Sequence, residues 1–105
     1  AHLPEAEREA ELVESKRLIE RNTGRASDLF CYPYGWCTVD DASTRAQVAR
    51  AGYRCALTAA PGFVARGDDP YALRRLGTRP RLASFVTDVA GISLFLRSVR
   101  AGLRA

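Results

Sequence analysis

Residues 30–36, Phe-Cys-Tyr-Pro-Tyr-Gly-Trp, constrain the fold more than any other stretch of this 105-residue chain. A continuous apolar run closed by turn residues is typical of a strand buried on both faces, as in a parallel sheet. Pro33 cannot donate a ladder hydrogen bond, so strand pairing should end there, and the glycine that follows permits a positive φ. The run predicts a strand end that carries Tyr32, Tyr34 and Trp36, where α/β folds keep their functional residues. The alternative is a buried aromatic corner followed by a hairpin.

Hydrophobic periodicity and turn signals divide the rest of the chain into alternating helices and strands. The expected elements are helix 5–22, strand 29–33, helix 42–51, strand 53–58, a short edge strand over 71–76 and an amphipathic helix 81–100. Two strands joined by a short helix should be parallel with a right-handed crossover. Gly91 weakens the last helix in its middle. The pattern predicts one α/β domain with parallel strands and flanking helices.

The three cysteines, Cys31, Cys37 and Cys55, cannot all pair within one chain. None lies in a Cys-x-x-Cys motif and the single histidine is His2, so the spacings of zinc modules are absent. We expect Cys31 and Cys55 to be buried in strands as small hydrophobes, and Cys37 to be exposed after the turn. Unpaired cysteines favour a reducing compartment such as the cytoplasm, and the N-terminus has no signal-like segment.

Charge is distributed unevenly along the chain. Residues 1–41 hold nine acids against five bases, whereas residues 71–105 hold seven arginines and one acid, Asp88. This asymmetry points to an acidic partner, but few aromatics are interleaved with the arginines and no nucleic-acid motif is present. We therefore expect a solvated arginine-rich helix face and no nucleic-acid partner. The alternative is a helix that docks on an anionic polymer or membrane surface, although no apolar stretch is long enough for a membrane span.

The order of these segments resembles a known family. The run 30–35, the following Ala51-Gly52-Tyr53 and the segment 69–76, Asp-Pro-Tyr-Ala-Leu-Arg-Arg-Leu, resemble the C-terminal part of polysaccharide deacetylases, the NodB homology domain of carbohydrate esterase family 4. The resemblance covers about residues 3–90. It implies that residues 1–105 form part of an irregular (β/α) barrel. Members of the family remove N- or O-acetyl groups from sugar polymers by hydrolysis that depends on a divalent metal, commonly zinc.

The resemblance also implies a role for the tyrosine turn. The backbone N–H of Tyr34 would help to stabilise the oxyanion of the tetrahedral intermediate, and its ring would line the substrate groove. Tyr32, Pro33 and Trp36 would belong to the wall that binds the sugar. The implied ligand is an acetylated polysaccharide or oligosaccharide.

The chain departs from the family pattern at the position of Cys31. Many members carry an arginine there that orients the base aspartate, and members with Tyr-Pro-Tyr-Gly lack it. Arg75, in the segment that resembles their Leu-Pro-Arg-Ile, would take over that pairing, although Arg74 replaces the proline. The alternative for Arg75 is a surface arginine of a basic strand.

The family's catalytic aspartates and its His-x-x-x-His metal motif have no counterpart in these 105 residues. His2 is the one candidate metal ligand, but Ala1-His2-Leu3 resembles the segment just after that motif, so an exposed histidine at a chain end is the alternative. Asp40-Asp41 is expected to cap a helix, and Asp68-Asp69 to lie in a turn. We therefore expect this chain alone to be inactive and without bound metal, and the parent enzyme to use zinc.

Partners follow from the incomplete barrel that the resemblance implies. Unpaired strand edges favour self-association, or pairing with a missing N-terminal part of the domain. The alternative function is a non-catalytic module for glycan binding or assembly, which keeps the aromatic turn without the chemistry.

Overall fold

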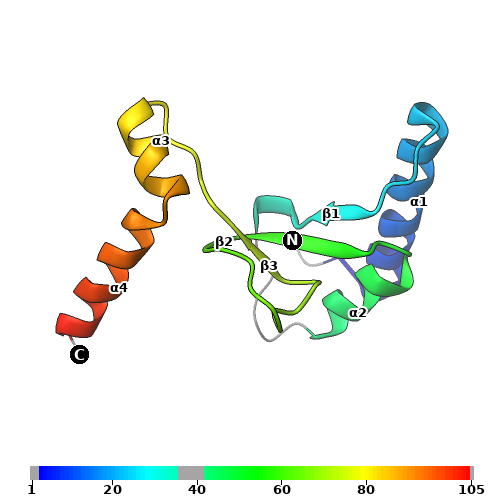
Figure 1. The fold of residues 1–105 in the computed structure, drawn as a ribbon. Helices are drawn as coiled ribbons and strands as arrows, with labels where there is room; N and C mark the ends of the chain where they lie inside the picture. Colours follow the sequence, from blue (N-terminus) through cyan, green and yellow to red (C-terminus); the bar gives the residue numbers. More distant parts are fainter. Residues whose placement is uncertain (1–2, 36–41, 105) are drawn as a thin grey trace.

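The computed structural model of the protein describes residues 3–35 and 42–104. Helices and strands alternate in its first three quarters, and helices complete it (Figure 1). In chain order the elements are α1 (Glu5–Thr23), β1 (Leu29–Cys31), the 3-10 turn η1 (Pro33–Gly35), α2 (Ala42–Arg50), β2 (Cys55–Pro61), β3 (Leu73–Arg75), α3 (Leu82–Val89) and α4 (Ile92–Arg104). The predicted bounds of the first helix are confirmed, and it ends as expected at Gly24, which has a φ of 67°.

The strands form a three-stranded sheet in the order β1-β2-β3, and both pairings are parallel. Leu29 lies opposite Cys55 on β2, and Leu57 lies opposite Leu73 on β3. The register shifts between Leu57 and Pro61, so β3 follows β2 less regularly than β1 does. The predicted mixed α/β class and the parallel pairing across α2 are confirmed.

A small core joins α1 and α2 to the sheet. Leu12 of α1 and Val48 of α2 pack with Tyr32, Tyr53 and Ala56. None of these five residues is more than 6% exposed. Helical spacing brings single residues of α1 and α2 to this face, while the strand residues alternate toward it. The burial of these side chains is what holds the two helices on the sheet.

A buried polar side chain also ties α1 to α2. Gln47 is fully buried, its Oε1 accepts a hydrogen bond of 2.6 Å from Nε of Arg8, and its Nε2 donates one of 2.9 Å to the Glu5 carbonyl. A buried amide without partners would be destabilising. These bonds therefore set the position at which α2 crosses the first turns of α1.

The strand predicted over 29–33 is shorter than expected and is not buried on both faces. β1 ends at Cys31; Leu29 is 63% exposed and Cys31 is exposed, whereas Phe30 packs against the core. Alternation along a strand sends Leu29 and Cys31 to the face opposite Phe30, and the described residues leave that face open. The prediction that Cys31 is buried is therefore wrong, and Cys55 is only half-buried.

The prediction of a single helix over 81–100 is wrong. The chain forms α3 and α4, which bend by 70° at a break that contains Gly91. Gly91 has a φ of 78°, and a Cβ at this position would lie 3.0 Å from the ring of Phe63. A left-handed glycine packed against an aromatic ring interrupts the helix. Gly91 was expected only to weaken the helix, and it instead forms the corner between α3 and α4.

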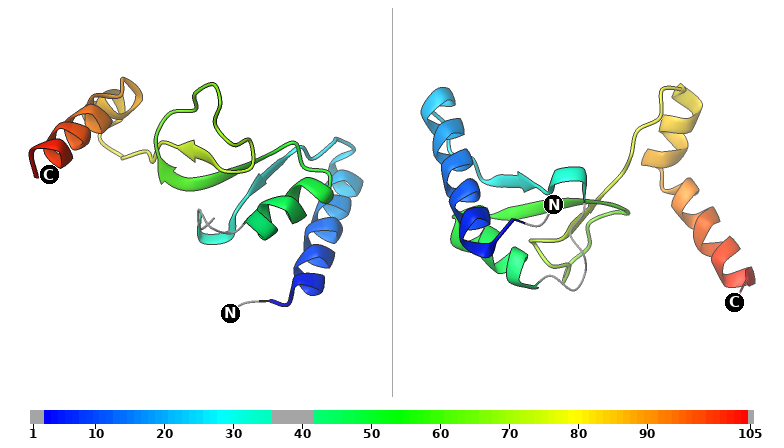
Figure 2. Two further views of the ribbon diagram at one scale, coloured as in Figure 1. Left: turned by 90° about the horizontal axis from the view of Figure 1, so that it is seen from below. Right: turned by 180° about the vertical axis from the view of Figure 1, so that it is seen from behind.

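Helices α3 and α4 lie apart from the sheet, at the opposite end of the molecule from α1 and α2 (Figures 1 and 2). The radius of gyration is 16.6 Å, against about 13 Å for a compact domain of this length. Among the described residues no single helix is long and apolar enough to cross a membrane; α3 and α4 reach that length and composition only together, across their 70° bend.

Candidate functional site

The residues singled out for function gather where β1 and β3 end. The turn η1 follows β1 directly and contacts β2. At its centre Tyr34 has a φ of 59° and a ψ of 11°, and its side chain is 94% exposed. A left-handed conformation costs an ordinary L-residue about 1–2 kcal/mol, so the surrounding structure must hold Tyr34 in place. Strain of this kind on an exposed aromatic residue is a feature of functional turns.

Tyr32, the residue before this turn, is fixed in the core. Its side chain is 4% exposed, its hydroxyl donates a hydrogen bond of 2.7 Å to the Tyr71 carbonyl, and its ring meets Phe30 edge-on at 5.3 Å. Its backbone N–H donates to the Leu57 carbonyl at 3.2 Å. The structure therefore places Tyr32 in the core and not in an open wall, whereas Pro33 is exposed. Trp36 lies outside the described residues.

Two further tyrosines support the site and were not singled out from the sequence. The Tyr71 hydroxyl donates to the Tyr53 carbonyl at 3.1 Å, and the Tyr53 hydroxyl lies 3.2 Å from Oγ of Ser15. With the bond from Tyr32, these contacts connect β1, the start of β2 and the approach to β3. The signals in the sequence were that each tyrosine begins a predicted strand and belongs to a segment that carries the family resemblance.

Arg75 reaches across the sheet from β3 to β1. Its Nε donates a hydrogen bond of 2.8 Å to the Thr58 carbonyl on β2, and its Nη1 lies 3.9 Å from Sγ of Cys31. Thr58 is itself fixed to β3, because its hydroxyl donates to the Leu73 carbonyl at 3.1 Å. The guanidinium group is thereby held beside the side chain at position 31, immediately before the tyrosine turn.

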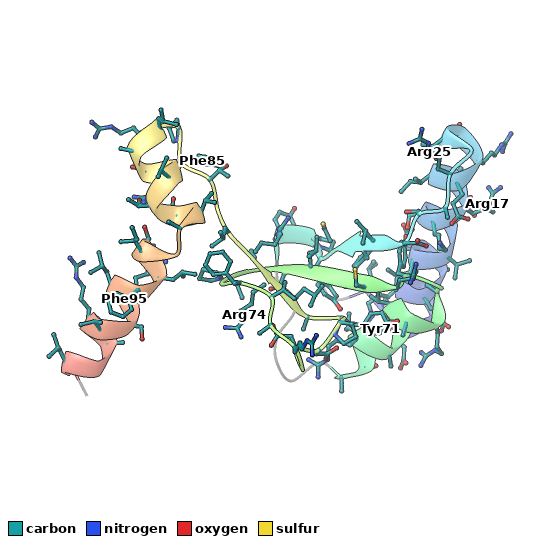
Figure 3. The ribbon with its side chains drawn as sticks, in the orientation of Figure 1. Arg17, Arg25, Tyr71, Arg74, Phe85 and Phe95 are labelled. Carbon is teal, nitrogen blue, oxygen red and sulfur yellow. The ribbon has the colours of Figure 1, made fainter. Side chains whose placement is uncertain are left out.

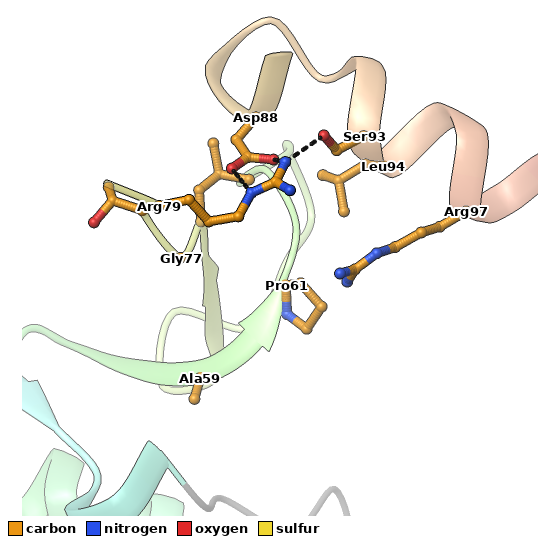
Figure 4. A pocket seen from close by; sticks show the side chains of 10 residues that line it. Ala59, Pro61, Gly77, Arg79, Asp88, Ser93, Leu94 and Arg97 are labelled. Atoms are coloured by element: carbon orange, nitrogen blue, oxygen red, sulfur yellow. Dashed lines mark hydrogen bonds and ion pairs between the residues drawn. The ribbon is translucent and has the colours of Figure 1, made fainter. Parts of the chain in front are cut away.

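A cavity of about 370 Å³ begins one residue beyond this arginine (Figure 4). Ala59 and Pro61 of β2 and Leu76 border it on one side, and Leu94 and Arg97 of α4 border it on the other. Arg97 extends toward Pro61 in Figure 4. The cavity is large enough for a small polar ligand, and neither Tyr34 nor Arg75 lines it.

An ion pair closes one side of the cavity. Nε and Nη2 of Arg79 bind the two carboxylate oxygens of Asp88 at 2.9 and 2.8 Å, and Nη2 also donates to Oγ of Ser93 at 3.3 Å (Figure 4). Hydrogen bonds from Arg79, and then from Ser93, hold the pKa of Asp88 below its usual range. Asp88 is thus an occupied acceptor, and Arg97 supplies positive charge to the cavity.

The described residues do not form a metal site. No group of three or more His, Cys, Asp or Glu side chains within residues 3–35 and 42–104 is placed to hold a metal ion. His2 and the Asp40-Asp41 pair lie outside the described residues. The turn role expected for Asp68 and Asp69 is confirmed, because their carboxylates accept the N–H groups of Ala65 and Tyr71 at 2.9 Å each.

The structure brings Arg75 and Cys31 together and places exposed Tyr34 just beyond them, while Tyr32 serves the core. No family model, no curated protein and no solved structure matches this chain. The case for a function therefore stands on the geometry of this sheet edge.

Proposed function

We propose that this chain is part of a polysaccharide deacetylase barrel that hydrolyses acetyl groups on sugar polymers. Its contribution is the oxyanion-binding turn at Tyr34 and a positioning arginine, Arg75. Three parallel strands, with α2 between β1 and β2 and two helices after β3, are consistent with a portion of an irregular (β/α) barrel. The outer face of β1, with Leu29 63% exposed, is consistent with a strand that a neighbouring part of a barrel would cover.

The contact between Arg75 and Cys31 carries the proposal. Many enzymes of this family have an arginine at the position of Cys31, and this chain has instead a guanidinium group that arrives from β3 and lies 3.9 Å from the Cys31 sulfur. Arg75 is exposed, yet its guanidinium group is held over β2 by the hydrogen bond to the Thr58 carbonyl. The geometry therefore supports the view that Arg75 compensates for the missing arginine.

In this proposal a water molecule attacks the acetyl carbonyl carbon and a carboxylate base takes its proton. The negative charge that develops on the carbonyl oxygen is stabilised by the N–H of Tyr34, whose direction is determined by the left-handed backbone. Arg75 pairs with the base carboxylate, keeps its pKa low and fixes its orientation. Collapse of the tetrahedral intermediate releases acetate and returns the proton to the sugar nitrogen or oxygen.

The divalent metal that the resemblance implies, zinc in most members, would polarise the acetyl carbonyl. The described residues do not fit such a site, since they contain no suitable group of ligands. In the proposal the metal ligands and the base carboxylate therefore come from the rest of a complete barrel.

The test is acetate release by the natural protein that contains these residues, with acetylated oligosaccharides as substrates. Arg75→Ala should lower kcat by about 10- to 100-fold, the effect of removing an orienting partner. It should also shift the acidic limb of the kcat profile to higher pH, because the base carboxylate loses a cationic neighbour. Arg74→Ala is the matched control, since the side chain of Arg74 points to the other face of β3 and pairs with Asp68.

A purely structural Arg75 would leave that pH profile unmoved, and such a result would remove the positioning role. Tyr34→Ala should weaken substrate binding with little change in folding, because its side chain is 94% exposed.

The exposed Tyr34 ring also favours a second function, a glycan-binding module without chemistry, because flat aromatic faces suit sugar rings. The two functions are separated by acetate release together with zinc content. Glycan affinity that depends on Tyr34, without acetate release by the natural protein, would establish the binding module and end the deacetylase proposal.

A further inference from the structure

A row of exposed apolar side chains runs along α3 and α4. We call it the apolar stripe. Its members recur at helical spacing on each helix, and none is buried: Leu82, Phe85, Val86 and Val89 on α3, and Ile92, Phe95, Leu96, Val99 and Leu103 on α4. Their exposed fractions range from 41% for Phe85 to 81% for Leu103. Many large apolar side chains exposed at helical spacing are typical of an interaction surface.

On α4 the apolar stripe lies away from the cavity. Ser93, Leu94 and Arg97 are the α4 residues that border the cavity toward β2 (Figure 4). Successive residues of a helix are about 100° apart, so the stripe residues Phe95 and Val99 lie on roughly the opposite side of α4. Figure 3 shows Phe85 and Phe95 on the helices that stand clear of the sheet. The fold therefore uses the polar side of α4 internally and presents the apolar side outward.

Positive charge lies at the edge of the stripe on α4. Arg100 follows Leu96 by four residues and so lies on the same side of the helix, whereas Arg97 borders the cavity. The sequence of α4 contains no acid. The acid on α3, Asp88, is neutralised by its bidentate pair with Arg79 at the cavity. An apolar face with arginines outside it is the composition of helices that lie in the interface of a membrane with anionic lipids.

We propose that α3 and α4 dock on an anionic lipid surface, with the apolar stripe among the acyl chains and Arg100 beside the headgroup phosphates. A second copy of the chain is the poorer occupant, because a contact between two α4 helices would leave Arg100 without an acidic partner on either of them. The 70° bend lets both short helices lie along a surface in different directions. This inference does not rest on the proposed deacetylase function, and each can fail without the other.

The experiment is flotation of the whole chain with vesicles of phosphatidylcholine that contain or lack phosphatidylglycerol, at low and at high salt. The chain should float with the anionic vesicles at low salt and be released as salt screens the arginines. Phe95→Ser with Leu96→Ser should lower partitioning by roughly 100-fold, since two large apolar side chains are removed from the interface. The matched control is Leu18→Ser with Ile19→Ser, an adjacent and similarly exposed pair on α1.

Arg100→Gln keeps the apolar stripe and should weaken binding about 5-fold, whereas Arg66→Gln, the same charge change in an exposed loop, should have no effect. Failure of the wild-type chain to float with anionic vesicles overturns the proposal. So does equal loss in the α1 pair, or loss with the arginine variants but not with Phe95→Ser and Leu96→Ser. A stable dimer that excludes vesicles and dissociates when Phe95 and Leu96 are replaced would identify a second copy as the occupant instead.

Discussion

The two ends of this molecule use helices in opposite ways. α1 is only weakly amphipathic, yet its Leu12 is 6% exposed and completes the core with α2 and the sheet. α4 is strongly amphipathic, yet every described member of its apolar stripe is at least 43% exposed. Residues 5–75 are thus held together by buried apolar side chains. Residues 82–104 have no such core, and their contacts are the Gly91 corner and the polar residues at the cavity.

This contrast shows that amphipathicity describes a helix and not its surroundings. The core at the first end depends on tyrosines whose hydroxyls find backbone carbonyls, as Tyr32 does at Tyr71. At the other end Arg79 pairs with Asp88 and Phe63 packs against Gly91 at the corner, and no described side chain of α3 or α4 is fully buried. The stability of the domain should therefore come almost wholly from residues 5–75.

Replacing buried Tyr32 should have the largest effect. Tyr32→Ala removes a large side chain from the core and should lower the free energy of unfolding by about 3–5 kcal/mol. Phe95→Ala, an equally large deletion in α4, should change it by no more than about 0.5 kcal/mol. Urea unfolding followed by circular dichroism measures both. Equal losses for the two variants would show that α4 is packed as tightly as the core.

The buried amide of Gln47 comes next. Gln47→Ala leaves the Glu5 carbonyl without this donor and takes an acceptor from Arg8, so it should cost about 1–3 kcal/mol. Asn22→Ala removes a comparable amide bond, from Nδ2 to the Leu18 carbonyl, on the exposed end of α1. That variant should change the unfolding free energy by less than about 0.5 kcal/mol. A larger loss of stability for Gln47→Ala than for Asn22→Ala would show that burial gives the amide its effect. Equal losses would contradict this.

The corner between α3 and α4 can be altered without touching the core. Gly91→Ala places a Cβ 3.0 Å from the Phe63 ring at a φ of 78°, so the corner should open at a cost of about 1–2 kcal/mol to local stability. Gly102→Ala, inside α4 with no neighbour near its Cβ, should instead favour the helix. Hydrogen exchange of the amides over 82–104 should rise in the first variant and fall in the second. Exchange in α1 and α2 should stay constant, and a change there would show that the two regions are coupled.

The smallest effect concerns pH and the Arg79–Asp88 pair. Since the folded-state pKa of Asp88 is depressed, its stabilising contribution is present at neutral pH and is lost as the pH falls through that pKa. Arg79→Gln should raise the pKa of Asp88, which carboxyl chemical shifts measured by NMR during an acid titration will detect. Arg81→Gln, two residues along the same exposed segment, serves as the control. An unchanged Asp88 titration in Arg79→Gln would show that the pair does not hold α3 to the segment before it.

The candidate site was only partly predictable from the sequence. The local order of apolar, proline and glycine residues predicted the turn after β1 and marked Tyr34 as a candidate functional residue. Arg75 was a second candidate, from the segment 69–76. The wall role of Tyr32 was assigned without knowing that its hydroxyl reaches Tyr71, 39 residues away. The approach of Arg75 to Cys31 spans 44 residues, so no local pattern encodes it.

The sequence by itself determined the features that depend on near neighbours: the extent of α1, its stop at Gly24 and the helical spacing of apolar residues over 82–99. The short helix between the first two strands also predicted their parallel pairing. Hydrogen bonds within a helix and the φ range of glycine are local, so they can be predicted from spacing. Only the tertiary structure decided that the outer face of β1 is open, that Gly91 makes a corner against Phe63, and that Arg75 crosses β2. Burial and contacts between distant segments depend on what packs against each face, and the spacing of residues along the chain does not predict this.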